Sequence, residues 1–170
     1  MYAIVGYFDE VTESMIVKLW EDLRDRAITD YPFRRMGHRP HLTFSSFPEL
    51  NSDLLQKLEP FADLSEALPL RFRLFGSFIK SDSFLLLPDP SSLLSEFQRE
   101  VYALQAASSL YSPENWIPHV TIANHLNLDQ QSAVQHLAKK RLEPFSGTLS
   151  KIALIQITEH AVIELQLYSL

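Results

Sequence analysis

The sequence contains no cysteine among its 170 residues, which excludes disulfide bonds, thiolate nucleophiles and cysteine-based zinc or iron–sulfur sites. It also lacks any apolar run near the roughly 18 residues that a membrane span needs. Basic residues are scarce, since 15 Lys and Arg stand against 21 Asp and Glu for a formal net charge of −6. That balance argues against a protein that binds long duplex nucleic acid through a basic surface.

The N-terminal residues are apolar, but they lack a basic start and meet Asp9 and Glu10 too early for a secretory signal peptide. We therefore expect a cytoplasmic protein with no membrane partner. A hydrophobic content of 46% allows a real core, and 170 residues suit one domain or two small, closely packed lobes. We expect this domain to be a monomer.

Apolar periodicity predicts helices and strands that alternate along the chain. The predicted strands cover residues 2–8, 41–47, 70–79, 83–87, 119–124, 149–158 and 161–168. The predicted helices cover residues 11–27, 51–61, 89–104 and 129–141, and Pro60 is expected to end the second of them nearby. Because most strand neighbours are close in sequence or joined by a helix, the class is α+β or mixed α/β, and we predict α+β.

The residues at the helix ends predict where three of these helices begin. Asp9 or Thr12 is expected to cap the first helix, and Asp129 the last. Asp89-Pro90 is expected to open the third helix, because proline fits the first helical turn.

One five-residue pattern occurs twice. Residues 40–44 read Pro-His-Leu-Thr-Phe, and residues 118–122 read Pro-His-Val-Thr-Ile. The copies lie almost half the chain apart, and each has a loop before it and a helix soon after. A duplicated half-domain explains this better than coincidence. We predict one bilobal domain over residues 1–170, with pseudo-repeat halves of about 1–88 and 89–170.

The spacing within each copy has a physical meaning, because alternate residues of a strand share one face. His41 and Thr43 therefore lie on one face, roughly 7 Å apart, and His119 and Thr121 do the same. If a pseudo-twofold axis relates the halves, two imidazoles and two hydroxyls meet in one cleft. That arrangement suits a tetrahedral phosphate held by the hydroxyls, with one neutral imidazole as base and one protonated imidazole as acid. The alternative is a pair of ordinary strand histidines, which the matched copies make less attractive.

These residues resemble the 2H phosphoesterases and, within them, the 2′-5′ RNA ligase-like branch. The resemblance rests on the two motifs, on the opening strand and helix of residues 2–27, and on the stretch from Gly76 to Leu87. Residues 116–122, Trp-Ile-Pro-His-Val-Thr-Ile, are the closest local match. The resemblance implies two pseudo-symmetric lobes, each a small, mostly antiparallel sheet with outer helices, around a central cleft.

The resemblance also implies an activity and assigns residues to it. The activity is metal-independent cleavage of a phosphodiester, often a 2′,3′-cyclic phosphate at a nucleotide or RNA 3′ end, or of a 2′-5′ linkage. His41 and His119 would be the acid–base pair, and Thr43 and Thr121 would hold the phosphate. No metal and no cofactor is expected. The alternative is a non-catalytic module that binds a nucleotide or phosphate in the same cleft.

Two further residues are candidate substrate contacts. Arg39 closes an arginine-rich loop that could steer an anionic substrate, although a solvated loop explains it equally well. Trp116 could stack on a nucleobase, although packing is the more common role of such an aromatic. The expected substrate is a small nucleotide or an RNA terminus.

Overall fold

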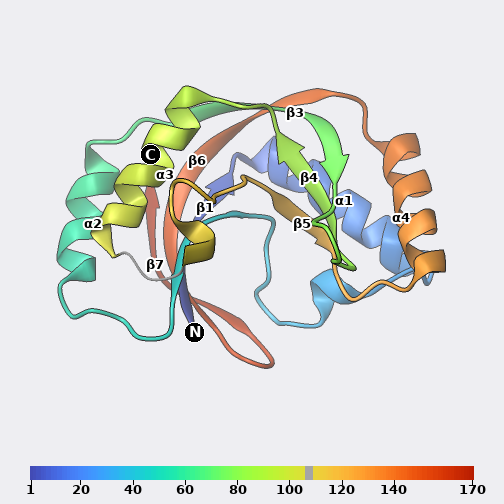
Figure 1. The fold of residues 1–170 in the computed structure, drawn as a ribbon, viewed down its shortest axis with the longest axis horizontal. Coiled ribbons are helices and arrows are strands. Elements are labelled where there is room, and N and C mark those ends of the chain that lie inside the picture. The colour runs from blue at the N-terminus through green and yellow to red at the C-terminus, as the bar shows by residue number, and fades with distance from the viewer. Residues whose placement is uncertain (106–108) are drawn as a thin grey trace.

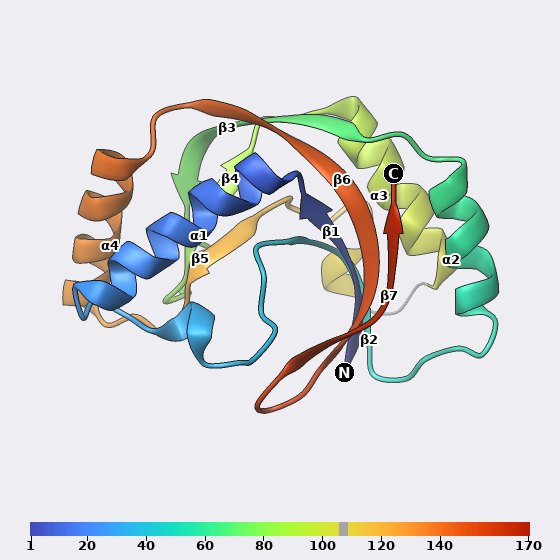
Figure 2. The same ribbon diagram turned by 180° about the vertical axis from the view of Figure 1, so that it is seen from behind.

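The computed structural model describes residues 1–105 and 109–170, and within them the chain forms one antiparallel sheet flanked by four α-helices (Figures 1 and 2). The strands are β1 (Tyr2–Phe8), β2 (Leu42–Phe47), β3 (Leu68–Gly76), β4 (Phe84–Pro88), β5 (Val120–Ala123), β6 (Phe145–Ile157) and β7 (Val162–Ser169). The helices are α1 (Glu10–Asp25), α2 (Leu54–Asp63), α3 (Ser92–Leu104) and α4 (Leu128–Arg141), with short 3-10 turns η1 (Tyr31–Phe33) and η2 (Ser109–Tyr111). The predicted α+β class is confirmed.

The long strand β6 belongs to two lobes. Its residues 149–156 pair with β1, which pairs in turn with β2, and β7 pairs along the opposite edge of β6. Its residues 145–149 pair with β3, which leads on to β4 and β5. The first lobe is therefore β2-β1-β6-β7 and the second is β6-β3-β4-β5, and Figure 1 shows β6 arching from one to the other.

The first lobe combines strands from both ends of the sequence, whereas the strands of the second lobe all come from residues 68–157. The order strand–helix–strand–helix–strand runs once from β1 to β3 and again from β4 to β6, with a His-x-Thr motif at the second strand each time. This order is compatible with the predicted internal repeat, which stays a prediction. It would start the second unit at β4, ahead of the predicted boundary after residue 88.

The helices cover the two lobes in pairs. Helices α2 and α3 pack against each other and reach β7 and β2, whereas α1 packs with α4 beside the second lobe (Figures 1 and 2). Beneath them runs a large apolar core, in which the Phe44 and Phe97 rings lie 5.2 Å apart and the Phe8 and Phe72 rings 5.9 Å apart. Because this core is shared, the two lobes hold each other in place.

The helix starts agree with the prediction at α1 and differ at α3 and α4. The Asp9 side chain accepts hydrogen bonds from the first turn of α1, which confirms it as the cap. At α3 the prediction was wrong, because Ser91 is the cap and Pro90 precedes the helix. At α4 the cap is Asn127 rather than Asp129. Only the asparagine has a glutamine three residues later, Gln130, with which it forms a reciprocal capping box.

Helix α2 continues through Pro60 to Asp63, further than predicted. A proline inside a helix removes one N–H, which would have bonded to the carbonyl four residues earlier. Here that carbonyl belongs to the exposed Gln56, so water can take the place of the missing donor.

Gly6 in β1 should tolerate a side chain poorly, because it packs against the core. A Cβ on Gly6 would lie 2.5 Å from Leu149 Cδ1 and 2.7 Å from Phe44 Cε2. We expect Gly6→Ala to lower the free energy of unfolding by about 1–3 kcal/mol, measured by urea denaturation. Gly76→Ala is the control, since its Cβ would meet the flexible end of Leu87 at 3.0 Å and should cost less. Equal losses in the two variants would contradict crowding as the cause.

Candidate functional site

The strands β2 and β5 present their motifs in the same way. His41 and His119 stand immediately before the strands, and Thr43 and Thr121 are half-buried on the face that follows from alternation. The intervening residues Leu42, Phe44, Val120 and Ile122 are fully buried in the core. The side chains of both motifs therefore alternate between the two faces of their strands, as predicted.

Each motif histidine is oriented by the same hydrogen bond. His41 Nδ1 lies 2.6 Å from the Arg39 carbonyl oxygen, and His119 Nδ1 lies 2.7 Å from that of Ile117. A carbonyl can only accept, so each Nδ1 carries a proton and donates it. In the neutral ring the remaining nitrogen, Nε2, then has a free lone pair. Both histidines thus offer Nε2 for chemistry, a point that the sequence pattern did not reveal.

The two motifs lie close enough to affect each other. A charge on His119 lowers the pKa of His41, so the two imidazoles are within electrostatic reach. The loop before β5 also touches the first motif directly, because Trp116 Nε1 donates to the Thr43 carbonyl at 2.8 Å. The side chains of Tyr111 and Thr43 are hydrogen-bonded as well. The structure thus brings residues from both halves of the sequence into one site.

Burial favours the neutral form of both histidines. It lowers the pKa of His41 to about 4, helped by charges on His38 and His119 and opposed by the hydrogen bond to Arg39. Burial also lowers the pKa of His119, again opposed by the carbonyl of Ile117. Desolvation penalises the charged imidazolium, which is the physical cause in both cases.

A third histidine, His38, lies against the site, although the sequence did not predict it as a site residue. Its ring is 5.6 Å from that of His41 and stacks on the buried Trp20 at 5.2 Å. Its Nδ1 lies 3.0 Å from the Pro32 carbonyl, and burial lowers its pKa too. The only signal in the sequence was its distance of three residues from His41, because the loop conformation decides where it points.

The two candidate substrate contacts lie beside the motifs. Arg39 forms ion pairs with Glu13 and Glu164, so its guanidinium is already engaged. Trp116 packs its ring 5.8 Å from that of Phe44. A direct contact of either residue with substrate stays a prediction.

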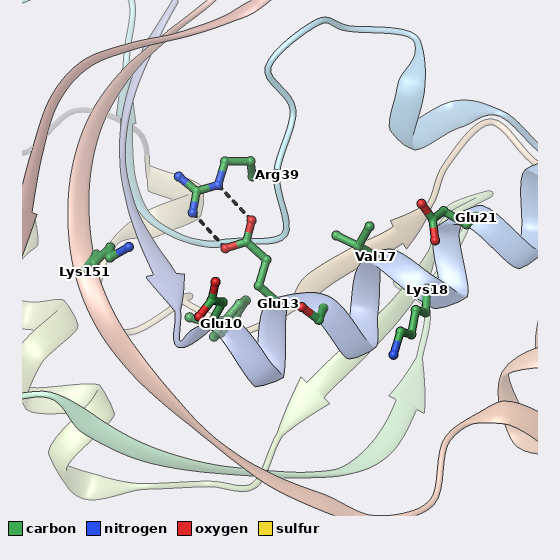
Figure 3. Close-up of a pocket in the computed structure, with 9 residues that line it drawn as sticks. Glu10, Glu13, Val17, Lys18, Glu21, Arg39 and Lys151 are labelled. Carbon is green, nitrogen blue, oxygen red and sulfur yellow. Dashed lines mark hydrogen bonds and ion pairs between the residues drawn. The ribbon is translucent and has the colours of Figure 1, made fainter.

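Two pockets flank the site. One of about 480 Å³ adjoins His119 and is lined by Phe78, Tyr111, Trp116 and Ile117 among others. Another of about 780 Å³ lies between α1 and β6, and Figure 3 shows its charged lining, with Glu13 and Arg39 bonded to each other and Lys151 across from α1.

Two structural features that would point to other functions are not found. Over the part of the chain that the structure describes, no three His, Asp or Glu side chains are arranged to hold a metal ion. None of the helices within residues 1–105 and 109–170 combines the length and apolar character of a membrane span.

Two lobes joined by a shared strand, with a His-x-Thr motif in each, are features of the 2H phosphoesterase class. The chain belongs to the 2′-5′ RNA ligase superfamily, whose family model matches residues 12–161. This confirms the resemblance stated from the motifs. Comparison with curated proteins gives no match.

Solved structures share the fold at low sequence identity. Escherichia coli LigT complexed with 3′-AMP superposes with a TM-score of 0.61 and 14% identity, over 99% of this chain and 96% of LigT. TT0787 of Thermus thermophilus superposes with a TM-score of 0.58 and 17% identity, over 99% of this chain and 97% of the TT0787 chain. A structure described as a phosphoesterase superposes with a TM-score of 0.60 and 16% identity, over 99% of this chain and 97% of the phosphoesterase chain.

The lowered pKa of His41 should make the fold sensitive to acid. The unfolded chain binds protons at the ordinary histidine pKa of about 6.5, whereas folded His41 does so only near 4. The free energy of unfolding should therefore fall as the pH drops from about 6.5 toward 4. In urea denaturation across this range, His41→Gln should lose less stability than the wild type. His160→Gln, at an exposed turn, is the control and should follow the wild type; a His41→Gln curve parallel to both would contradict the prediction.

Proposed function

We propose that the protein is a metal-independent phosphodiesterase that opens a 2′,3′-cyclic phosphate or cleaves a 2′-5′ linkage of a nucleotide or RNA end. The observation that carries this proposal is the matched orientation of His41 and His119. Each ring is bonded through Nδ1 to the carbonyl two residues earlier, and each has a threonine two residues later. Two imidazoles with free Nε2 atoms and two hydroxyls supply what paired acid–base cleavage of a phosphodiester requires.

In the proposed reaction, water attacks the phosphorus of the cyclic phosphate opposite the departing ribose oxygen. One imidazole accepts the proton of the water, the bond from phosphorus to the ribose oxygen breaks, and the other imidazole protonates that oxygen. Thr43 and Thr121 hold the non-bridging oxygens. The product is a nucleotide with a phosphate monoester.

The surroundings of the two rings favour different roles. His41 lies against His38, so protonation of His41 is opposed by burial and by charge on that neighbouring ring. We therefore assign the base to His41 and the acid to His119, whose pKa is lowered by burial without such a neighbour. This division goes beyond the motif, which treats the two histidines alike.

The size and lining of the pocket beside His119 support a nucleotide as substrate. Its aromatic side chains Phe78, Tyr111 and Trp116 suit a nucleobase, which stacks on such rings without strong dependence on sequence. The net charge of −6 argues against a long RNA. LigT, which shares the fold, has been crystallised with 3′-AMP, ATP and NADP+, all of which are small nucleotide ligands.

Removal of either imidazole should abolish most of the activity. We expect His41→Ala and His119→Ala each to lower kcat on 2′,3′-cyclic AMP by about 10²–10⁴-fold, because each removes one proton-transfer step. Thr43→Ala and Thr121→Ala should have milder effects, about 1–3 kcal/mol in kcat/KM. The control is His136→Ala, an exposed histidine on α4. The assay should include a 2′-5′-linked dinucleotide, so that the two substrate classes are compared.

Two outcomes would contradict this assignment. Full activity in either histidine variant would exclude the paired mechanism. A stoichiometric complex of the wild-type protein with intact 2′,3′-cyclic AMP, and no product from either substrate, would favour the non-catalytic binding module.

The pH dependence of kcat/KM should be bell-shaped, because the free protein needs a neutral base and a protonated acid. Activity should fall as the pH drops toward about 4, where His41 becomes protonated. It should fall again as the pH rises through a value below the ordinary histidine pKa of about 6.5, where His119 loses its proton. Initial rates on 2′,3′-cyclic AMP measure both limbs, with re-assay at the optimum to exclude unfolding. A flat profile between about pH 5 and pH 8 would contradict the mechanism.

A further inference from the structure

The side chain of Arg39 is fixed by three elements of the fold. Its Nε and Nη2 donate to the two carboxylate oxygens of Glu13 in α1, at 2.8 and 2.7 Å, and Figure 3 shows this paired contact. Its Nη1 lies 3.4 Å from Glu164 in β7. Its Cζ stands 4.1 Å above the ring centre of Tyr7 in β1. We call Glu13, Arg39, Glu164 and Tyr7 the arginine clamp.

The clamp is a rigid arrangement rather than a loose surface ion pair. The Arg39 and Glu13 side chains are only 32% and 21% exposed, and two parallel bonds join a guanidinium to a carboxylate in a fixed plane. Tyr7 is 1% exposed and packs in the apolar cluster of the first lobe, so it offers an immobile surface beneath the guanidinium. The clamp also joins α1, which packs beside the second lobe, to β7 of the first.

The backbone of the clamped residue orients His41. The Arg39 carbonyl is the acceptor for His41 Nδ1 at 2.6 Å. Pro40 stands between the two residues, and proline fixes its own φ while restricting the residue before it to extended conformations. Little freedom therefore remains between the anchored side chain and the carbonyl. Tyr7 adds a second link, because its ring also meets that of His41 edge-on at 6.5 Å.

The second motif has no such anchor on its orienting residue. His119 Nδ1 bonds to the carbonyl of Ile117, whose apolar side chain is 47% exposed and cannot form an ion pair. His119 therefore serves as an internal reference, because it has the same hydrogen bond without the clamp.

We propose that Arg39 is a positioning residue, whose clamped side chain holds the carbonyl that keeps His41 in its Nδ1–H tautomer with Nε2 free for chemistry. The kinetic consequence rests on the proposed function, in which His41 takes part in proton transfer. The structural consequence, the tautomer of His41, does not.

The tautomer is measured by ¹H–¹⁵N correlation NMR of the imidazole nitrogens in the full-length protein. In the wild type, His41 and His119 should both show the Nδ1–H form. In Arg39→Met, which keeps an unbranched aliphatic side chain and removes the guanidinium, His41 should become a mixture of tautomers while His119 stays unchanged. Glu13→Gln should change His41 in the same direction, and it tests the clamp if Arg39→Met does not fold.

Kinetics separate positioning from substrate contact. If Arg39 acts through His41, Arg39→Met should lower kcat by about ten- to a hundredfold and leave KM within about twofold. Arg39→Lys, which keeps the charge without the paired geometry, should give an intermediate kcat. The matched control is Arg141→Met, because Arg141 makes a similar paired contact with Asp22, at 2.8 and 3.0 Å, that joins α4 to α1. This variant should keep the wild-type kcat, KM and His41 tautomer.

Each result decides the proposal. A His41 tautomer unchanged in both Arg39→Met and Glu13→Gln would overturn it, and a raised KM with unchanged kcat would make Arg39 a substrate contact instead. If the wild-type protein proves inactive on every substrate tested, the proposed function fails, and the NMR experiment still confirms or refutes the clamp.

Discussion

The candidate site depends on one hydrogen bond that occurs twice, from the Nδ1 of each motif histidine to the carbonyl two residues earlier. This bond selects the tautomer and thereby decides which ring nitrogen is available for chemistry. It also explains the proline of each motif, which stands between the acceptor and the histidine in both copies. Because proline fixes its φ and holds the preceding residue extended, it brings that carbonyl back toward the imidazole.

The separation of the two motifs is determined by strand register rather than by a hinge. Strand β6 pairs with both β1 and β3, and the two pairings meet at the fully buried Leu149. From there, β1 leads to the first motif on β2, and β3 leads through β4 to the second on β5. A slip of one residue in any of these pairings would turn a motif toward the core. The core shared by both lobes opposes such slips, since every register change would expose apolar side chains.

Most of the strands could be predicted from short apolar runs, and the faces of the motifs from period-two alternation, because both are local properties of the sequence. His41 and Thr43 share a face whatever the rest of the chain does, and the same holds for the second copy. The arginine clamp and the place of His38 could not be predicted, because the path of the loop before β2 depends on contacts with residues that are distant in the sequence. Within that loop, the Met36 N–H donates to the His160 carbonyl in the β6–β7 connection at 3.0 Å, and the Met36 carbonyl accepts from the N–H of Val162 at the start of β7 at 2.9 Å. No local pattern encodes a contact of that kind.

The proposed mechanism poses a chemical problem, and the surroundings of the two motifs suggest how it is resolved. Two identical imidazoles across one phosphate would have the same proton affinity, yet acid–base catalysis needs one protonated and one neutral ring. The motifs are alike, but their neighbours are not: His41 lies against a second imidazole, that of His38, whereas His119 meets the edge of Phe78 at 5.1 Å beside an aromatic pocket. A titratable ring beside one histidine and apolar side chains beside the other separate their proton affinities. Under the proposed mechanism, two similar motifs would in this way supply a base and an acid, and the difference between them would come from residues outside the motifs.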